Sequence, residues 1–177
     1  MRVISGQFGG RTLVAPRGRD TRPTSDRVRE ALFSILADVA GARVLDLFAG
    51  SGALGIEALS RGAAGATLVD NSRVAVQCIE HNLAALGATA QVHRMSAATF
   101  LDRARADARQ YDLIFLDPPY RQARALAVQL SAALPPVLAP EGRVVAESDR
   151  RAPLTLELAQ LDERRYGDTL IRIYGSR

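Results

Sequence analysis

Apolar and polar residues alternate along this chain in blocks that predict strands and helices in turn. From residue 43 onward, short apolar runs centre on Leu45, Leu68, Val92, Ile114 and Val145. The segments between these runs keep helical spacing, roughly over 54–61, 73–86, 97–108 and 124–134. Strands that alternate with helices in this way form a mostly parallel sheet with helices on both faces.

The two ends of the chain depart from this alternation. Residues 2–4 and 11–14 are short strand candidates separated by glycines, and a helix should follow Thr24 or Ser25. After Glu147 we expect two further strands, at 154–161 and 169–174, which would close the sheet as an antiparallel hairpin.

Length and composition favour one domain in a reducing compartment. The 177 residues divide most simply into an N-terminal extension, 1–40, and a core, 41–177. Cys78 is the single cysteine, so no internal disulfide can form, and the longest uncharged run is too short and interrupted to span a bilayer. We therefore expect a cytoplasmic protein without membrane association, and a monomer.

The charge is concentrated near the N-terminus. Residues 1–30 carry seven arginines and three acidic residues, and so account for the whole net charge of +4. A neutral body with a basic N-terminal segment predicts that this segment contacts a phosphate backbone. A solvated, salt-bridged surface is the alternative explanation.

One short stretch, Asp117-Pro118-Pro119-Tyr120, places a carboxylate, two prolines and an aromatic ring directly after the apolar run 111–116. The prolines remove two backbone donors and disfavour a helical turn, so the segment should leave the sheet as an extended loop with free carbonyls. Such a loop could grip a planar group that bears an amine, which describes a nucleobase better than most other ligands.

A second stretch runs from an apolar strand into a glycine-rich turn, where Gly50, Gly52 and Gly55 match G-x-G-x-x-G. Asp70 ends the next strand, where an acidic residue can accept hydrogen bonds from ribose hydroxyls. These features fit NAD or S-adenosylmethionine. Asp46, just before the turn, favours S-adenosylmethionine, because a carboxylate there would repel a pyrophosphate but suit a cationic sulfonium.

The chain resembles class I S-adenosylmethionine-dependent methyltransferases, and specifically the RsmD family, over nearly its full length. The resemblance is carried by Arg-Pro-Thr-Ser-Asp-Arg at 22–27, Leu-Asp-Leu-Phe-Ala-Gly-Ser-Gly at 45–52, the Asp-Pro-Pro-Tyr loop and Tyr-Gly-Asp-Thr at 166–169. It implies an α/β, Rossmann-like fold: a mostly parallel seven-stranded sheet with an antiparallel C-terminal hairpin, plus a small N-terminal hairpin and helix. It also implies methylation of the exocyclic N2 of a guanine in 16S rRNA, within the 30S ribosomal subunit or its assembly intermediate.

The expected site residues occupy these motif positions. The Asp117 carboxylate and the Pro118 carbonyl should orient the amine, and Tyr120 should stack on the base. The expected cofactor-binding residues are Asp46, Phe48, Gly50, Gly52, Asp70, Ser96 and Ala97. The expected RNA-binding residues are Arg11, Arg22, Arg27 and Arg29. We expect no metal, because direct methyl transfer needs none.

Two positions depart from the family pattern. Asp70 stands where the family usually has glutamate, and Ser96-Ala97 stands where it usually has Asp-Ala beside the adenine of the cofactor. Asp70 keeps the carboxylate, whereas Ser96 can hydrogen-bond the adenine amine but brings no charge. We therefore expect cofactor binding to persist, but more weakly than the family pattern gives.

Three other functions stay open at this point. Asp-Pro-Pro-Tyr alone also fits adenine-N6 methyltransferases that act on DNA or RNA. An NAD-dependent oxidoreductase would leave Asp46 and the Pro-Pro loop unexplained. A non-catalytic RNA-binding module would leave the intact Asp117–Tyr120 loop without a role.

Overall fold

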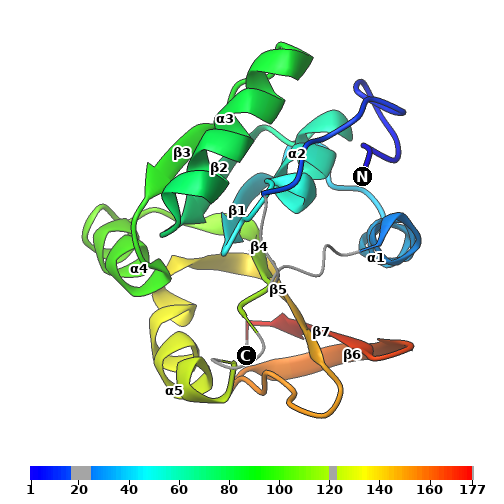
Figure 1. Cartoon of the computed structure of the whole chain (residues 1–177). Coiled ribbons are helices and arrows are strands. Elements are labelled where there is room, and N and C mark those ends of the chain that lie inside the picture. The colour runs from blue at the N-terminus through cyan, green and yellow to red at the C-terminus, as the bar shows by residue number, and fades with distance from the viewer. Residues whose placement is uncertain (17–24, 120–122, 177) are drawn as a thin grey trace.

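A seven-stranded sheet of order β3-β2-β1-β4-β5-β7-β6 forms the centre of the protein (Figure 1). The computed structural model describes residues 1–16, 25–119 and 123–176. The strands are β1 (Arg43–Leu47), β2 (Gly65–Asp70), β3 (Gln91–Arg94), β4 (Tyr111–Leu116), β5 (Leu138–Asp149), β6 (Ala159–Tyr166) and β7 (Thr169–Gly175). Strands β1 to β5 pair in parallel, and β7 runs antiparallel to β5 and β6. The predicted fold class is confirmed.

Helices cover both faces of the sheet, as the alternation predicted. They are α1 (Asp26–Leu36), α2 (Ala53–Ser60), α3 (Arg73–Leu86), α4 (Ala97–Ala106), α5 (Ala123–Ala133) and the short 3₁₀ helix η2 (Pro135–Val137). Leu32 of α1, Ile56 of α2 and Ile79 of α3 belong to the apolar cluster on one face. Phe100 of α4 and Leu130 of α5 belong to the cluster on the other face.

The N-terminal segment is fixed to α2 by one buried carboxylate. Glu57 is fully buried, and it accepts hydrogen bonds from the backbone amides of Ile4 (2.7 Å) and Ser5 (3.1 Å) and from Arg61 Nε (2.7 Å). Gly6 follows with φ +83°, and a Cβ built there would lie 1.8 Å from the carbonyl oxygen of Ser60. This close approach permits only glycine.

The predicted N-terminal hairpin forms, with an antiparallel bridge between Arg2 and Thr12 and backbone hydrogen bonds from the Val3 amide to the Arg11 carbonyl and from the Leu13 amide to the Met1 carbonyl.

One strand prediction needs correction. The strand predicted at 154–161 begins later, because β6 spans Ala159–Tyr166. Leu154 and Leu156 are buried but lie outside any strand. The Leu154 carbonyl accepts a hydrogen bond from Tyr174 Oη at 3.2 Å. Their apolar character reflects burial in a loop rather than pairing.

Within the described part of the chain, no helix is both long and apolar enough to cross a bilayer.

We predict that Glu57→Ala destabilises the protein by about 3 kcal/mol, because it leaves a partly buried arginine and two amides without their acceptor. Chemical denaturation of the full chain measures this change. Glu80→Ala, which removes an exposed carboxylate from α3, is the control and should change stability by less than about 0.5 kcal/mol. Equal losses in the two variants would contradict the role given to Glu57.

Candidate active site

The predicted site residues gather where neighbouring parallel strands end. Asp46 lies in β1, Asp70 ends β2 and Asp117 directly follows β4, and these strands are adjacent in the order β2-β1-β4. The order of the strands along the chain reverses between β1 and β4. Open α/β sheets bind ligands at such a switch point, beyond the carboxyl ends of the strands.

The turn after β1 has the backbone that the glycine pattern predicted. Gly50 has φ +57° and Gly52 has φ +77°, both in the left-handed region. Phe48 also has a positive φ, +65°, which is uncommon for an aromatic residue and is held by the surrounding turn. Gly52 caps α2 without a side-chain hydrogen bond, so the first turn of this helix faces the site with its own amides.

Asp70 connects the end of β2 to this turn. Its Oδ2 accepts a hydrogen bond from the backbone amide of Gly50 at 2.9 Å, and its Oδ1 accepts one from the amide of Ser72 at 2.8 Å. Each oxygen keeps a further lone pair for a ribose hydroxyl. The half-buried Asp70 therefore shapes the turn and can still contact a cofactor.

Asp46 is a buried carboxyl between β1 and α2. It is 2 % exposed, and its Oδ2 accepts a hydrogen bond from the Gly55 amide at 2.9 Å. A Cβ on Gly55 would lie 2.2 Å from Leu68 Cδ2 of β2, so glycine lets α2 approach the sheet this closely. Burial, with a smaller contribution from the charge of Asp70, raises the pKa of Asp46 to about 7, although the hydrogen bond from Gly55 opposes the rise.

Asp117 begins the acceptor loop. The residue is half-buried, and Pro118 behind it is buried. Withdrawal from water raises the pKa of the Asp117 carboxyl well above its ordinary value, and the charges of Glu147 and Asp46 raise it further. The sequence analysis missed Glu147, a 4 % exposed residue of β5. The sequence did contain a signal for this residue, because Glu147 follows the apolar run Val144–Ala146 just as Asp46 follows apolar residues in β1.

Ser96 and Ala97 begin α4 beyond the end of β3. Ser96 is the N-cap of this helix, since its Oγ accepts a hydrogen bond from the Thr99 amide at 3.1 Å and lies 2.8 Å from Thr99 Oγ1. Its hydroxyl is therefore already engaged in capping. Contact between Ser96 or Ala97 and a cofactor stays a prediction.

The expected RNA-binding arginines divide into exposed and buried ones. Arg27 and Arg11 are exposed, and Arg11 Nη2 donates to the carbonyl of Ala85 at 2.7 Å. Arg29 is fully buried, and its Nη2 donates to the Arg2 carbonyl and to Asp26 Oδ1. The prediction that Arg29 contacts RNA is wrong, because its guanidinium points into the protein. Arg22 and Tyr120 lie outside the described residues.

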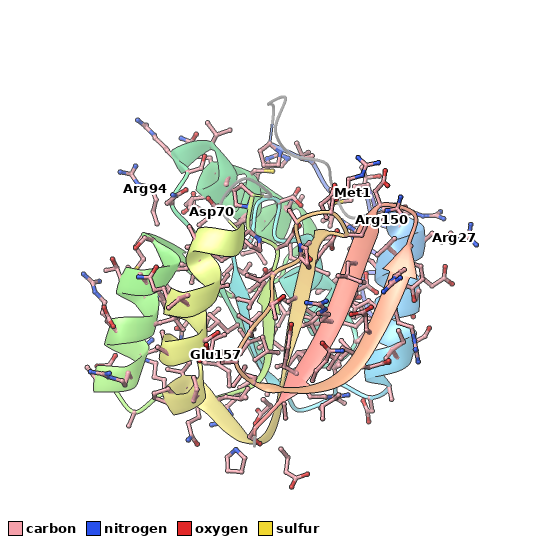
Figure 2. All side chains as sticks on the ribbon, turned by 90° about the horizontal axis from the view of Figure 1, so that it is seen from below. Met1, Arg27, Asp70, Arg94, Arg150 and Glu157 are labelled. Carbon is pink, nitrogen blue, oxygen red and sulfur yellow. The ribbon has the colours of Figure 1, made fainter. Side chains whose placement is uncertain are left out.

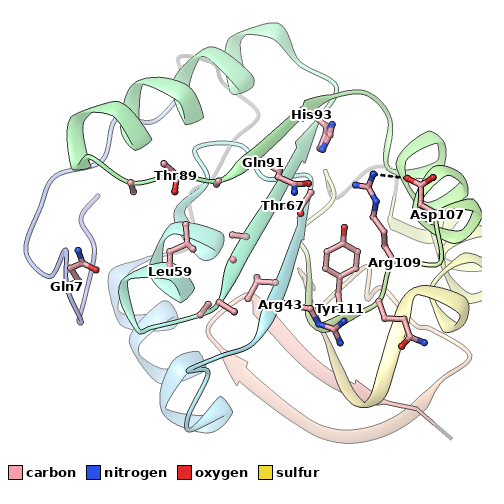
Figure 3. Close-up of a pocket in the computed structure, with 18 of the residues that line it drawn as sticks. Gln7, Arg43, Leu59, Thr67, Thr89, Gln91, His93, Asp107, Arg109 and Tyr111 are labelled. Atoms are coloured by element: carbon pink, nitrogen blue, oxygen red, sulfur yellow. Dashed lines mark hydrogen bonds and ion pairs between the residues drawn. The ribbon is translucent and has the colours of Figure 1, made fainter.

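A groove of about 1080 Å³ lies at the opposite edge of the sheet (Figure 3). Arg43, Gly65, Gln91 and Tyr111, which begin β1, β2, β3 and β4, all line it. None of the described residues that we expect for catalysis or cofactor binding does. This groove is therefore separate from the candidate active site.

The arrangement of the site suits a cationic cofactor with a ribose. The pKa values of the Asp46 and Asp117 carboxyls are raised, because both groups are buried and lie near other acids. A bound cation would favour their ionised forms. In the described residues, no group of three or more His, Cys, Asp or Glu side chains is arranged to hold a metal ion.

Comparisons with known proteins point to one family. The family model described as "Conserved hypothetical protein 95" matches residues 1–175. "Putative rRNA methyltransferase YlbH" of Bacillus subtilis is 42% identical over 183 aligned residues that cover 100% of both chains. "Ribosomal RNA small subunit methyltransferase D" of Escherichia coli is 48% identical over 124 residues, which are 69% of this chain and 61% of that protein. The solved structure "Putative methyltransferase yhhF" from Escherichia coli has a TM-score of 0.84 at 38% identity and covers 100% of this chain and 98% of that chain.

We predict that Asp46→Asn raises the melting temperature relative to the wild type, and that the gain grows as the pH rises toward about 7 and levels off above it. The folded protein keeps a proton on Asp46 between pH 3.8 and about 7, where the unfolded chain has lost it. The stabilisation from this proton is therefore lost as the pH rises through that window, by up to about 1.4 kcal/mol per pH unit. Asparagine carries no charge to bury and can still accept the Gly55 hydrogen bond.

Melting curves of the unliganded protein between pH 5 and pH 8 measure this difference. Asp102→Asn, on the exposed face of α4, is the control and should give a difference that does not vary with pH. A constant difference between Asp46→Asn and the wild type would show that Asp46 ionises normally.

Proposed function

The chain belongs to the family described as "Conserved hypothetical protein 95", the RsmD family of class I S-adenosylmethionine-dependent methyltransferases, and we propose that it methylates the exocyclic N2 of a guanine in 16S rRNA. The observation that carries the proposal is the meeting of Asp46, Asp70 and Asp117 at the switch point of the sheet. Two of these acids belong to the cofactor side of the site, and Asp117 begins the loop that would hold the base.

On the cofactor side, S-adenosylmethionine supplies a methyl group activated by its sulfonium charge. Asp70 accepts the ribose hydroxyls with the lone pairs that the Gly50 and Ser72 amides leave free. Gly50 and Gly52 keep the turn open beside the amides of α2, and Phe48 lies at the same turn. Ser96 and Ala97 would contact the adenine. The Ser96 hydroxyl also caps α4, which limits the hydrogen bonds that it can offer to the cofactor.

On the acceptor side, Asp117 and the Pro118 carbonyl hold the amine of the base. A nucleobase amine is a poor nucleophile, because its lone pair is delocalised into the ring. Hydrogen bonds from its two N–H groups to these acceptors orient the nitrogen toward the methyl carbon, and such positioning supplies much of the rate enhancement. The Asp117 carboxylate also stabilises the positive charge that develops on the nitrogen. Tyr120 would stack on the base, worth about 1–3 kcal/mol.

The choice of RNA as substrate rests on the names of the relatives and on the N-terminal extension. That extension lies beside the glycine turn, since Met1 Sδ is 3.5 Å from Ser51 Oγ, and the Asn82 side chain donates hydrogen bonds to the carbonyls of both Val14 and Ser51. Arg27 of α1 and Arg150, just after β5, extend from the side of the molecule where Met1 lies (Figure 2). RNA held by these exposed arginines would reach the acceptor loop.

More specifically, we propose that the target is guanine 966 of 16S rRNA on the 30S subunit or on its assembly intermediate. We also propose that the enzyme is a cytoplasmic monomer. Arg11, Arg27 and Arg150 are the described arginines that we propose for RNA contact, and Arg22 is a further candidate. Residues 1–40 form the RNA-contacting extension of a single methyltransferase domain whose core is 41–177.

We predict that the wild-type protein transfers a labelled methyl group to small ribosomal subunits that lack this modification, and that digestion and mass spectrometry identify N2-methylguanosine. Asp117→Ala should lower the turnover number by at least about 100-fold, because the amine loses both an acceptor and electrostatic stabilisation. It should leave binding of S-adenosylhomocysteine within a few-fold of the wild type.

The products and the variant separate the remaining alternatives. Methyladenine as product would replace the proposal with an adenine-N6 activity. Wild-type protein that gives no methylated nucleoside would contradict the enzymatic function, and an Asp117→Ala variant with full turnover would remove Asp117 from the mechanism.

We predict that Arg27→Ala weakens binding of a 16S rRNA fragment and makes the affinity less dependent on salt. Each lost phosphate contact should reduce the slope of log K against log salt by about 0.7–0.9. Arg105→Ala is the matched control, because Arg105 is exposed near the end of α4 at the opposite edge of the sheet. Equal slopes for the two variants would place the RNA elsewhere than on α1.

A further inference from the structure

We propose that Glu147 is a further residue of the methyl-transfer site: with Asp117 and Asp46 it forms a three-carboxyl cluster that holds a proton until a sulfonium cation binds. The proposal rests on the same site as the proposed function, but it concerns the binding of the cofactor and not the identity of the base. Nothing in the motifs of the sequence assigns a role to Glu147.

The strand register brings the three carboxyls together. Leu116 of β4 pairs with Ala146 of β5, so Asp117 and Glu147 are the next residues along two adjacent parallel strands. Such strands lie about 4.8 Å apart. The other neighbour of β4 is β1, where Asp46 pairs with Phe115, two residues before Asp117. The three acids therefore come from three consecutive strands of the sheet.

The alternation of side chains puts all three on one face. Leu116 and Ala146 belong to the apolar cluster under α4 and α5, whereas Phe115 and Val145 belong to the cluster under α1, α2 and α3. Side chains alternate between the faces of a strand, so Asp117 and Glu147 lie on the face of α1, α2 and α3. Asp46 shares this face, because Leu45 and Leu47 on either side of it belong to the other cluster.

The described residues add one further acid and one buried cation beside the cluster. Asp70 of β2 is a fourth acid and lies near Asp46. On the other side of β5, the β7 residue that pairs with Glu147 is the apolar Ile171. Arg29 of α1 is the buried cation on this face, and it is attracted to Glu147 as well as to Asp26 and Glu57. Its Nη2 is bound to Asp26 and to the Arg2 carbonyl, and its Nε and Nη1 have no hydrogen-bond partner among the described residues.

This arrangement favours one ionised and one protonated carboxyl between Glu147 and Asp117. Arg29 attracts the negative charge of Glu147, and that charge in turn raises the pKa of Asp117. Two close carboxyls withdrawn from water commonly share a proton in this way. We therefore place the proton on Asp117 in the unliganded protein, with Glu147 ionised beside it.

The proton balance then follows the reaction. When a sulfonium cation binds near Asp46 and Asp117, the O–H bond of Asp117 breaks, the proton leaves to solvent, and the carboxylate remains to accept the N–H groups of the base. After the methyl group has moved, the positive charge lies on the methylated nitrogen and the cofactor product is neutral. The N–H bond of that nitrogen breaks and the proton returns to Asp117. The cluster regains its starting charge, and one proton is released for each methyl group transferred.

Two binding measurements on the full-length chain test this proposal without any turnover. The affinity for S-adenosylmethionine, measured by calorimetry over a range of pH, should rise about tenfold per pH unit while Asp117 holds its proton in the free protein, and should level off once this carboxyl is ionised. S-adenosylhomocysteine lacks the sulfonium charge but shares the other groups, so its affinity should depend less on pH. Titration in two buffers with different protonation enthalpies measures the released proton directly.

The variant Glu147→Gln tests the residue itself. It keeps the size and polarity of the side chain but removes its charge, so the pH dependence of S-adenosylmethionine affinity should flatten. Asp112→Asn is the control: Asp112 is a carboxyl of the neighbouring strand β4, but it pairs with Arg43 at the opposite edge, and its removal should leave the dependence unchanged.

Either of two results would overturn the proposal. One is an equal pH dependence for S-adenosylmethionine and S-adenosylhomocysteine, a comparison that uses only the wild-type protein and so does not depend on the folding of a variant. The other is a folded Glu147→Gln protein with the wild-type pH dependence. Because neither measurement involves RNA, these failures would leave the proposed methylation of guanine intact.

Discussion

Burial of several carboxyls at one edge of a parallel sheet is the constraint on which the rest of this structure depends. The strands β2, β1, β4 and β5 run in the same direction, so Asp70, Asp46, Asp117 and Glu147 meet at the same edge. Removal of these acids from water raises the pKa of Asp46 and Asp117. Acids that lie together in this way favour the binding of a cation, and S-adenosylmethionine is the cation that the family uses.

The N-terminal extension belongs to the same electrostatic arrangement. Buried Glu57 fixes the first residues to α2, and buried Arg29 joins α1 to the Arg2 carbonyl while it attracts Glu147. The segment that we propose for RNA contact is thus connected, through buried polar groups, to the strand beside the acceptor loop. An extension that lay on the surface without these buried contacts would not connect the RNA-binding side to the site.

The sequence predicted the sheet, its helices and the edge that carries the site, because periodicity and glycine turns are local signals. It did not predict that Arg29 is buried, since the spacing of α1 alone places this residue on the polar face of the helix. Glu147 was missed for a related reason: only the pairing of β4 with β5 brings it beside Asp117. Leu154 and Leu156 were assigned to a strand because burial in a loop and burial in a strand give the same apolar pattern.

The most direct test of this account is a crystal structure of the chain with S-adenosylhomocysteine. The account predicts that the ligand lies at the carboxyl edge, with its ribose hydroxyls on Asp70 and its sulfur near Asp46 and Asp117. A ligand bound instead in the groove at the opposite edge, beside Gln91 and Tyr111, would contradict it.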